Sequence, residues 1–149
     1  MGAAGIDAID GGCGPAPVTY VSGFELETDS CVSVTCSHNP PDYNGLKMVV
    51  AGETLSGDAI QALKQRIEAG DVHWADQPGQ MRVADVKSAY LDRIVGDVKL
   101  ARPMTIAVDC GNGVAGELAP ELFKRMGCTV IPLFCEIDGT FPNHHPDPP

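Results

Sequence analysis

The sequence predicts an α/β protein in which mixed and parallel sheets are flanked by helices. Short apolar runs of strand length alternate along the chain with longer segments whose apolar residues recur at helical spacing. Towards the C-terminus, segments 104–109, 118–126 and 129–133 read as a strand, a helix and a strand in succession. Such a unit is expected to place its two strands parallel, joined by a right-handed crossover. The 149 residues are enough for one domain or for two incomplete ones.

Local signals predict the remaining elements. Apolar runs of strand length occur at 6–9, 31–35 and 46–50. Apolar residues at helical spacing predict helices that begin near Pro17, after Ser56 and at about Asp85. Ser56 would cap the second of these helices, whose apolar face we expect to cover the core. Segment 71–82 has no such period and predicts a loop, in which Trp74 would cover the edge of the core.

Charge and hydropathy limit the class of function. The chain has 10 Lys and Arg against 20 Asp and Glu, so its formal net charge is −10. Nucleic acids and anionic membranes are bound through basic patches, so neither is expected as a partner. No apolar run is long enough for a membrane span. The first residues also lack the basic region and apolar core of a signal peptide, so we expect a cytoplasmic protein.

The cysteines and histidines do not form a recognisable metal site. None of the six cysteines belongs to a Cys-x-x-Cys pair, which favours buried free thiols in a reducing compartment over a zinc site. His144 and His145 are adjacent, and adjacent side chains point in two directions in an extended chain. The proline-rich tail from Asp138 onwards therefore predicts an ordered surface connection rather than a His/Asp metal site.

One loop, between the strands predicted at 31–35 and 46–50, carries groups suited to phosphoryl transfer. Its prolines, asparagines, aspartate and glycine are typical of a tight, ordered turn. Ser37 supplies a hydroxyl nucleophile and His38 an imidazole beside it. Lys47 returns to the same neighbourhood if the two strands are adjacent. A nucleophile, an acid/base and a fixed cation suit this reaction, because charge develops on the phosphoryl oxygens. On spacing alone, an ordinary turn also explains the string.

The whole string adds a specific resemblance. Residues 35–47 are similar to the phosphoserine loop of the α-D-phosphohexomutases, the family of phosphomannomutases and phosphoglucomutases, which reads Thr-x-Ser-His-Asn-Pro-Pro-x-x-Asn-Gly-x-Lys. Cys36 stands where the family usually has glycine or alanine. Relatives with alanine indicate that this position needs no positive φ angle. The resemblance extends from Ile6 to Pro148 and covers only part of a family-length chain.

The resemblance implies an activity and roles for the residues of the loop. The enzyme would interconvert hexose 1-phosphate and hexose 6-phosphate, with glucose and mannose both accepted as in similar bacterial enzymes. Ser37 would carry a phosphoryl group, donate it to the sugar, and take the other one back from a hexose 1,6-bisphosphate. His38 and Lys47 would complete the catalytic group. Asn39 and Lys47 would bind the phosphosugar, with Asn39 also holding the loop through bonds to its backbone.

The resemblance also implies a metal but no organic cofactor. Mg²⁺ would bind through the phosphate carried by Ser37, together with three aspartates of the family that lie outside this chain. We assign no residue to any other cofactor. The full-length enzyme is expected to be a monomer.

The same resemblance divides the chain into two incomplete phosphohexomutase-type domains. Residues 1–82 correspond to the C-terminal part of domain 1, with the phosphoserine loop, and residues 83–149 to the N-terminal part of domain 2. A preceding strand, the arginine and tyrosine of the substrate loop, and the metal-binding aspartates of the family would lie outside the sequence. The chain by itself is therefore expected to be inactive.

Two other functions remain open. Gly111, Gly113 and Gly116 have the spacing of a dinucleotide fingerprint. Glu136 lies where a ribose-binding acid is sought, so the pattern predicts an NAD-binding oxidoreductase. Two observations argue against this function. Pro120 falls in the first turns of the following helix. The glycine turn at 111–116 also resembles the opening of the second mutase domain, where the glycines bind no nucleotide. The third possibility is a non-catalytic remnant that only binds.

Overall fold

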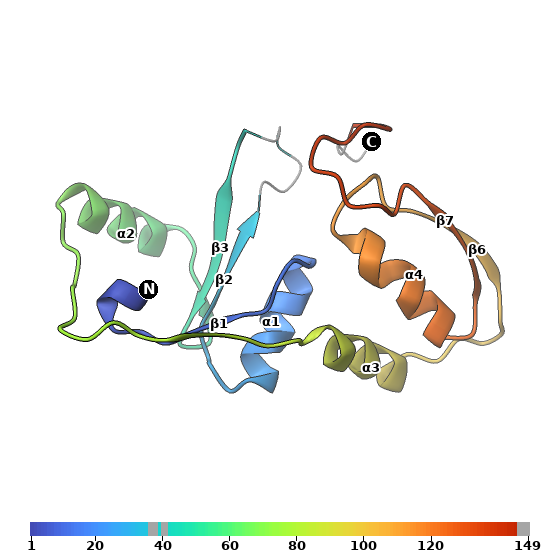
Figure 1. Ribbon diagram of the computed structural model, residues 1–149, viewed down its shortest axis with the longest axis horizontal. Helices are drawn as coiled ribbons and strands as arrows, with labels where there is room; N and C mark the ends of the chain where they lie inside the picture. Colours follow the sequence, from blue (N-terminus) through green and yellow to red (C-terminus); the bar gives the residue numbers. More distant parts are fainter. Residues whose placement is uncertain (36–38, 40–41, 146–149) are drawn as a thin grey trace.

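The computed structural model of the chain describes residues 1–35, 39 and 42–145 (Figure 1). Its helices are the 3-10 helix η1 (Gly2–Ala4) and the α-helices α1 (Ala16–Glu25), α2 (Asp58–Glu68), α3 (Lys87–Asp97) and α4 (Ala115–Arg125). Its strands are β1 (Ala8–Asp10), β2 (Cys31–Thr35), β3 (Gly45–Val50), β4 (Glu53–Thr54), β5 (Met81–Val83), β6 (Thr105–Asp109) and β7 (Thr129–Leu133). The predicted α/β class, with mixed and parallel sheets flanked by helices, is confirmed.

The strands form three small sheets. β1 pairs in parallel with β5, β6 pairs in parallel with β7, and β2, β3 and β4 form an antiparallel sheet. The β6–α4–β7 unit is the strand–helix–strand unit that the sequence predicts. Its register runs from Thr105 opposite Thr129 to Asp109 opposite Leu133, and α4 lies along one face of the pair (Figure 1). The carboxyl ends of β6 and β7 therefore meet at one edge.

The antiparallel hairpin of β2 and β3 has two different faces. Cys31 and Val49 are cross-strand partners and line a cavity of about 240 Å³ together with Tyr20 and Phe24 of α1. This face is therefore turned towards α1. Because side chains alternate along a strand, the opposite face carries the apolar set. Its exposed members are Val32, Val34, Leu46 and Val50.

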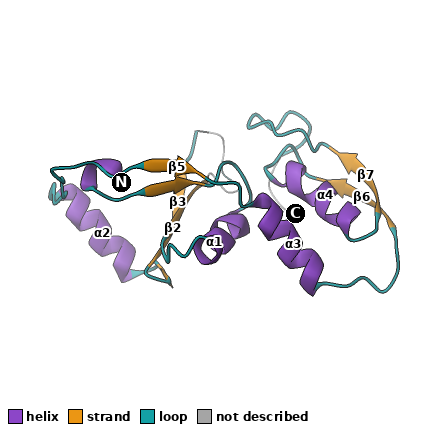
Figure 2. Cartoon of the chain, turned by 60° about the horizontal axis from the view of Figure 1, so that its bottom comes forward, coloured by secondary structure: helices purple, strands orange, loops and turns teal. Residues whose placement is uncertain are grey.

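The buried core joins the two halves of the chain. Val18 of α1, Leu91 of α3 and Leu118 of α4 form one cluster with Val86, which caps α3. Figure 2 shows α3 between α1 and the β6–α4–β7 unit. Two ion pairs join the surfaces of α3 and α4. These are Lys87 Nζ to Glu117 Oε2 at 2.6 Å and Arg125 Nη1 to Asp92 Oδ1 at 2.8 Å.

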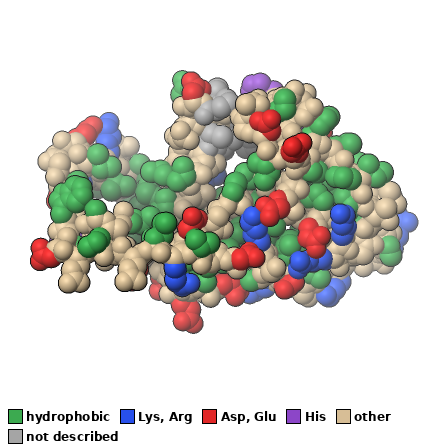
Figure 3. All heavy atoms as spheres, in the orientation of Figure 1, with side chains coloured by type: hydrophobic (Ala, Val, Ile, Leu, Met, Phe, Trp, Pro, Cys, Tyr) green, Lys and Arg blue, Asp and Glu red, His purple; other side chains and the backbone are tan. Residues whose placement is uncertain are grey.

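Polar and apolar side chains are distributed unevenly over the surface. Charged side chains of both signs are interspersed over the half that contains α3 and α4 (Figure 3). Exposed apolar side chains gather on the other half, around β1, β5 and the hairpin (Figure 3). Within the described parts of the chain, no helix combines the length and apolar character that a membrane span requires.

Helix α2 corrects two of the predictions. Its N-cap is Gly57 rather than Ser56, and the cap makes no side-chain hydrogen bond. The helix has no buried residue, and Ile67 on its predicted core face is 66% exposed. An apolar stripe shows which side of a helix a partner would cover, but it does not supply the partner. In the structure α2 lies apart from the buried cluster (Figure 1).

Three further predictions differ from the structure. The segment predicted as a loop over 71–82 leads into strand β5, whose backbone groups are hydrogen-bonded by parallel pairing with β1. Three residues are too few to show the alternation of side chains that would predict a strand. Trp74 is 71% exposed and covers no core, since the connection from α2 to β5 lies outside the buried cluster. Among the described cysteines Cys128 is buried, but Cys13 is exposed, so the free thiols are not uniformly buried.

Candidate active site

The β2–β3 hairpin holds the two ends of the predicted active loop together. Thr35 and Gly45 are the last cross-strand pair, and residues 36–44 connect them. A Cβ atom on Gly45 would lie 3.0 Å from the carbonyl oxygen of Thr35, so the close approach of the strands favours glycine there. The adjacency of the two strands, on which the predicted site depends, is thus confirmed.

The residues within the loop are only partly described. Ser37 and His38 lie outside the described residues, so their roles as nucleophile and acid/base stay predictions. Asn39 is exposed and lies in a bend. Its predicted contact with the phosphosugar also stays a prediction.

Lys47 lies on β3, directly opposite Ser33 and two positions from the Thr35–Gly45 pair. Strand alternation puts it on the face turned towards α1, opposite to Leu46. A strand advances about 3.3 Å per residue, so the Cα of Lys47 is roughly 7 Å from that pair. The side chain is exposed, and it makes no ion pair with any residue that the structure describes. Lys47 is therefore available to an anionic group near the loop entrance.

A second polar cluster, which sequence reasoning missed, lies at the carboxyl ends of β6 and β7. Asp109 ends β6, and its Oδ1 lies 3.0 Å from Nε2 of His144. The same oxygen accepts the backbone N–H of Gly111 at 2.8 Å. The hydrogen bond from His144, followed by that from Gly111, lowers the pKa of Asp109. The bond to Asp109 in turn raises the pKa of His144.

Asn112 connects this turn to two later segments. It is 5% exposed and has a φ angle of 60°. Its Nδ2 donates to the carbonyl oxygen of Glu136 at 2.9 Å, and its Oδ1 accepts from Nδ2 of Asn143 at 2.7 Å. Its backbone N–H donates to Phe134, and its carbonyl accepts from Asp138. The tail is thereby held against the turn after β6, as an ordered connection.

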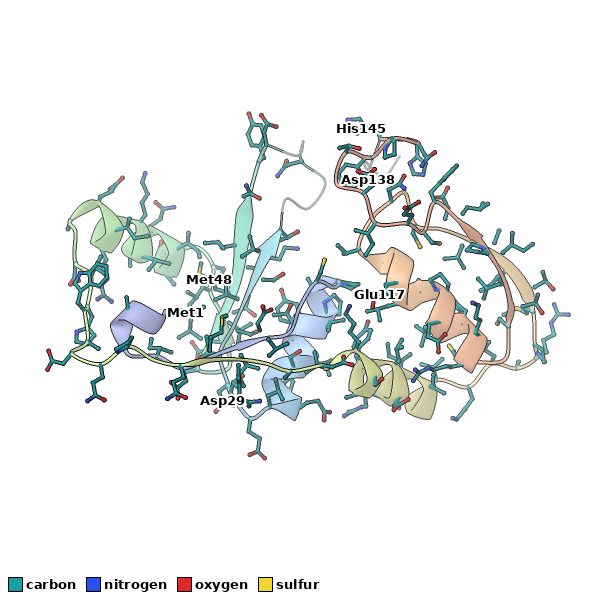
Figure 4. The ribbon with its side chains drawn as sticks, viewed as in Figure 1. Met1, Asp29, Met48, Glu117, Asp138 and His145 are labelled. Carbon is teal, nitrogen blue, oxygen red and sulfur yellow. The ribbon has the colours of Figure 1, made fainter. Side chains whose placement is uncertain are left out.

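The tail and the hairpin point towards one end of the molecule. Asp138 and His145 lie at the end towards which β2 and β3 extend (Figure 4). His144 also contacts Phe134 edge to face, with ring centroids 5.7 Å apart. The part of the tail up to residue 145 is therefore fixed by contacts from both β6 and the segment after β7.

The glycines of the dinucleotide-like pattern have packing roles. Gly111 has a φ angle of 50°, and a Cβ atom there would lie 2.8 Å from Cε1 of His144. A Cβ atom on Gly116 would overlap the backbone carbonyl of Cys135. Glycine at these two positions therefore leaves room for the side chain of His144 and for the backbone of Cys135. These packing contacts give the NAD-binding alternative no support.

Comparison with known proteins decides the family. The description "Phosphoglucomutase/phosphomannomutase, alpha/beta/alpha domain I" matches residues 1–73, and the corresponding domain II matches residues 88–149. The chain belongs to the phosphoglucomutase/phosphomannomutase family. The predicted domain boundary near Arg82 falls between the two matched ranges and stays a prediction.

Individual members of the phosphoglucomutase/phosphomannomutase family are similar over nearly the whole chain. A phosphomannomutase/phosphoglucomutase of Pseudomonas aeruginosa is 53% identical over 144 residues, which cover 97% of this chain and 31% of the relative. A phosphoglucomutase of Neisseria gonorrhoeae is 49% identical over the same length, with the same coverage. A crystal structure of a family protein from Burkholderia thailandensis has a TM-score of 0.90 at 49% identity, covering 98% of this chain and 33% of that one. The chain thus spans about a third of the length of these relatives.

The described residues of this mutase-family chain do not supply a metal site. Over residues 1–35, 39 and 42–145, no three His, Cys, Asp or Glu side chains are grouped as a metal ion would require. The predicted ligand, a phosphate on Ser37, lies outside this part of the chain.

Proposed function

We propose that this chain forms part of a phosphohexomutase that interconverts hexose 1-phosphate and hexose 6-phosphate through a phosphoserine at Ser37. The observation that carries the proposal is the identity of about half of all positions to proteins named phosphomannomutase/phosphoglucomutase and phosphoglucomutase. Those names support glucose and mannose phosphates as substrates. The complete phosphoserine-loop pattern at 35–47 supports the position of the nucleophile.

The proposed reaction has two phosphoryl transfers. In the first, the P–O bond to Ser37 Oγ breaks, a new P–O bond forms to the free hydroxyl oxygen of the hexose phosphate, and the proton of that hydroxyl passes to Ser37 Oγ. The resulting hexose 1,6-bisphosphate reorients in the site. In the second transfer the P–O bond to the other sugar oxygen breaks, that phosphoryl group returns to Ser37 Oγ, and the serine proton passes to the freed sugar oxygen. Substrate and product therefore differ only in which hydroxyl carries the phosphate.

His38 and Lys47 have complementary roles in this proposal. Transfer passes through a loose transition state with charge on the equatorial phosphoryl oxygens, so fixed positive charge is the main requirement. Lys47 would supply that charge from β3, and His38 would accept or return the hydroxyl proton. Asn39 would hold the loop and contact the sugar phosphate.

The metal and the cellular context belong to the same proposal. The phosphate on Ser37 would hold Mg²⁺ together with carboxylates from outside this chain. A bound divalent ion neutralises phosphoryl charge. The net charge of −10 argues against nucleic acid or an anionic membrane as a partner, whereas a phosphosugar needs only a few cations gathered locally, such as Lys47. We place the full-length enzyme in the cytoplasm as a monomer.

The deciding experiment maps phosphorylation in a chain of full family length. Peptide mass spectrometry after incubation with glucose 1,6-bisphosphate should find phosphate on Ser37. Ser37→Ala should abolish both the incorporation and the turnover of glucose 1-phosphate in a coupled assay. Ser33→Ala, a serine on β2 opposite Lys47, is the matched control and should keep the phosphate on Ser37. Phosphate on Ser33 or Ser56, with Ser37 bare, would overturn the proposal.

The 149-residue chain provides the second arm of this experiment. We propose that it does not turn over glucose 1-phosphate, because the other charged groups of the site would lie outside it and preorganised charge is usually the largest catalytic contribution. Robust turnover by the chain alone would show that the essential residues have been placed wrongly.

A further inference from the structure

Two thiols lie in contact at the edge where β6 and β7 end. The Sγ atoms of Cys110 and Cys135 are 3.4 Å apart, although 25 positions separate the residues in sequence. Cys110 directly follows β6, and one residue, Phe134, separates Cys135 from the end of β7. Within the described residues this is the one contact between two thiols.

Backbone hydrogen bonds continue beyond the β6–β7 ladder and hold the two cysteines side by side. The N–H of Cys110 donates to the carbonyl of Leu133 at 3.0 Å, and the N–H of Asn112 donates to Phe134 at 2.7 Å. The thiol of Cys135 faces the carbonyl of Leu133 at 3.4 Å and that of Val108 at 3.6 Å. The segment that carries Cys110 is therefore hydrogen-bonded through its backbone to the segment that carries Cys135.

Access distinguishes these two thiols from the thiol of Cys128. Both residues are half-buried, so a small oxidant can reach them, whereas Cys128 is buried. Burial, followed by the hydrogen bond with Cys135, raises the pKa of Cys110 to about 12. Only a thiolate is strongly nucleophilic, so oxidation needs one of the two thiols to lose its proton. Because the two sulfur atoms are in contact, either thiol then has the other as its immediate reaction partner.

We propose that Cys110 and Cys135 are a modification site that a peroxide closes to an intramolecular disulfide. The thiolate of one cysteine attacks the peroxide, the O–O bond breaks, and a sulfenic acid and water are formed. The Sγ atom of the other cysteine then attacks the sulfenic sulfur and a second water leaves. Two thiols and one hydrogen peroxide thus give one disulfide and two waters. The sulfur atoms need only approach from 3.4 Å to about 2 Å.

The disulfide would fasten the turn after β6 to the segment after β7. Cys110 lies between Asp109, which is bonded to His144 of the tail, and Asn112, which is bonded to Asn143 of the tail. The link would therefore restrain the same turn that anchors the tail. In a reducing compartment, thiol–disulfide exchange with a small thiol would reopen it. This inference does not depend on the proposed phosphoserine chemistry.

The test is disulfide mapping of the reduced protein after treatment with hydrogen peroxide. The expected result is the loss of two of the six thiols and a link between the peptide that contains Cys110 and the one that contains Cys135. Cys128 and Cys135 share a tryptic peptide, so fragment-ion sequencing or the Cys128→Ser variant must separate them. The midpoint of thermal unfolding should rise by about 5 °C and return on reduction.

Matched variants distinguish a specific pair from general oxidation. Cys110→Ser and Cys135→Ser should each abolish the link. Cys13→Ser, which removes an exposed thiol elsewhere, should leave its yield unchanged. Peroxide treatment that leaves both thiols reduced, or that links either one to a different cysteine, would overturn the proposal. Mapping on the unmodified protein decides the matter even if a serine variant does not fold.

Discussion

At the scale of single residues, Lys47 is the described side chain on which the proposed catalysis depends most. It is exposed on the face of β3 turned towards α1, two positions from the mouth of the loop. In a chain of family length with Ser37 fully phosphorylated, Lys47→Ala should lower kcat by about 10²-fold or more, as for other removed transition-state donors. Lys47→Arg should restore activity only in part, because the planar guanidinium group of arginine does not reproduce the compact charge of the lysine ammonium group.

Lys64 provides the control for this loss of a positive charge. It is an exposed lysine on α2 that pairs with the exposed Glu68 at 3.7 Å. Lys64→Ala makes the same change in net charge and should leave kcat unchanged. A Lys47→Ala enzyme with near-normal kcat would show that Lys47 is only a solvated lysine on its strand.

Asn112 supports a prediction about stability. Asn112→Ala leaves the carbonyl of Glu136 and the amide of Asn143 without their partner, and it places alanine at a φ angle of 60°. The free energy of unfolding in urea should fall by about 2–4 kcal/mol. Asn112→Gly loses the same hydrogen bonds but relieves the backbone, so it should cost about 1 kcal/mol less. Equal losses for the two variants would contradict the backbone contribution.

The loop at 35–47 could be predicted from the sequence, but the contacts of Asp109 and Asn112 could not. The string at 35–47 is continuous, so its composition and spacing could be recognised directly. The partners of Asp109 and Asn112 are 35 and 31 positions away in the tail. A pattern read along the chain does not show which distant side chain will meet a given carboxylate or amide. Asp109, at the carboxyl end of a predicted parallel strand, gave the one usable signal.

At the scale of elements, the Asp109–His144 pair joins the tail to the end of β6 and should make that contact pH-dependent. The pKa of His144 is raised above its ordinary value of 6.5, so its contribution is complete below that value and is lost as pH rises through the raised pKa. The pKa of Asp109 is lowered from 3.8, so its contribution is present above that value and is lost as pH falls through the lowered pKa. The contact should be strongest between about pH 4 and pH 6.5.

An NMR titration of the His144 ring checks this expectation. Asp109→Asn should return the pKa of His144 towards its ordinary value, because the largest cause of the shift is the bond to Asp109. Asp138→Asn removes a carboxylate elsewhere in the same tail, one that bonds to Thr140, and should have little effect. A pKa of His144 that is the same with and without Asp109 would show that the pair does not form in solution.

The elements themselves were predicted unevenly. The strands of the hairpin and of the β6–α4–β7 unit were predicted from apolar runs, and α3 from apolar residues at helical spacing; the structure confirms these elements. Strand β5 was missed because its three residues depend on pairing with β1, which lies some 70 positions earlier in the chain. The apolar stripe of α2 was recognised, but its exposure was not, because a stripe carries no information about its partner.

At the scale of the whole molecule, one buried cluster serves both predicted domains. The cluster takes residues from α1 on one side of the boundary near Arg82 and from α3 and α4 on the other. The strand and helix signals predicted the contents of each half, but not that α3 would be packed by both. That arrangement depends on contacts between segments that are far apart in sequence. It implies that the two halves stabilise each other.

Leu91 tests this coupling. It is 3% exposed and belongs to the buried cluster. Leu91→Ala should therefore lower the free energy of unfolding by about 2–5 kcal/mol, the usual cost of a core cavity. Hydrogen exchange should become faster both in β2 and in β6, because the cluster contacts both halves. Val98→Ala, just beyond the same helix at a position 45% exposed, is the control and should change neither. Faster exchange confined to β6 would show that the two halves unfold independently and that the shared cluster contributes little to the half that carries the hairpin.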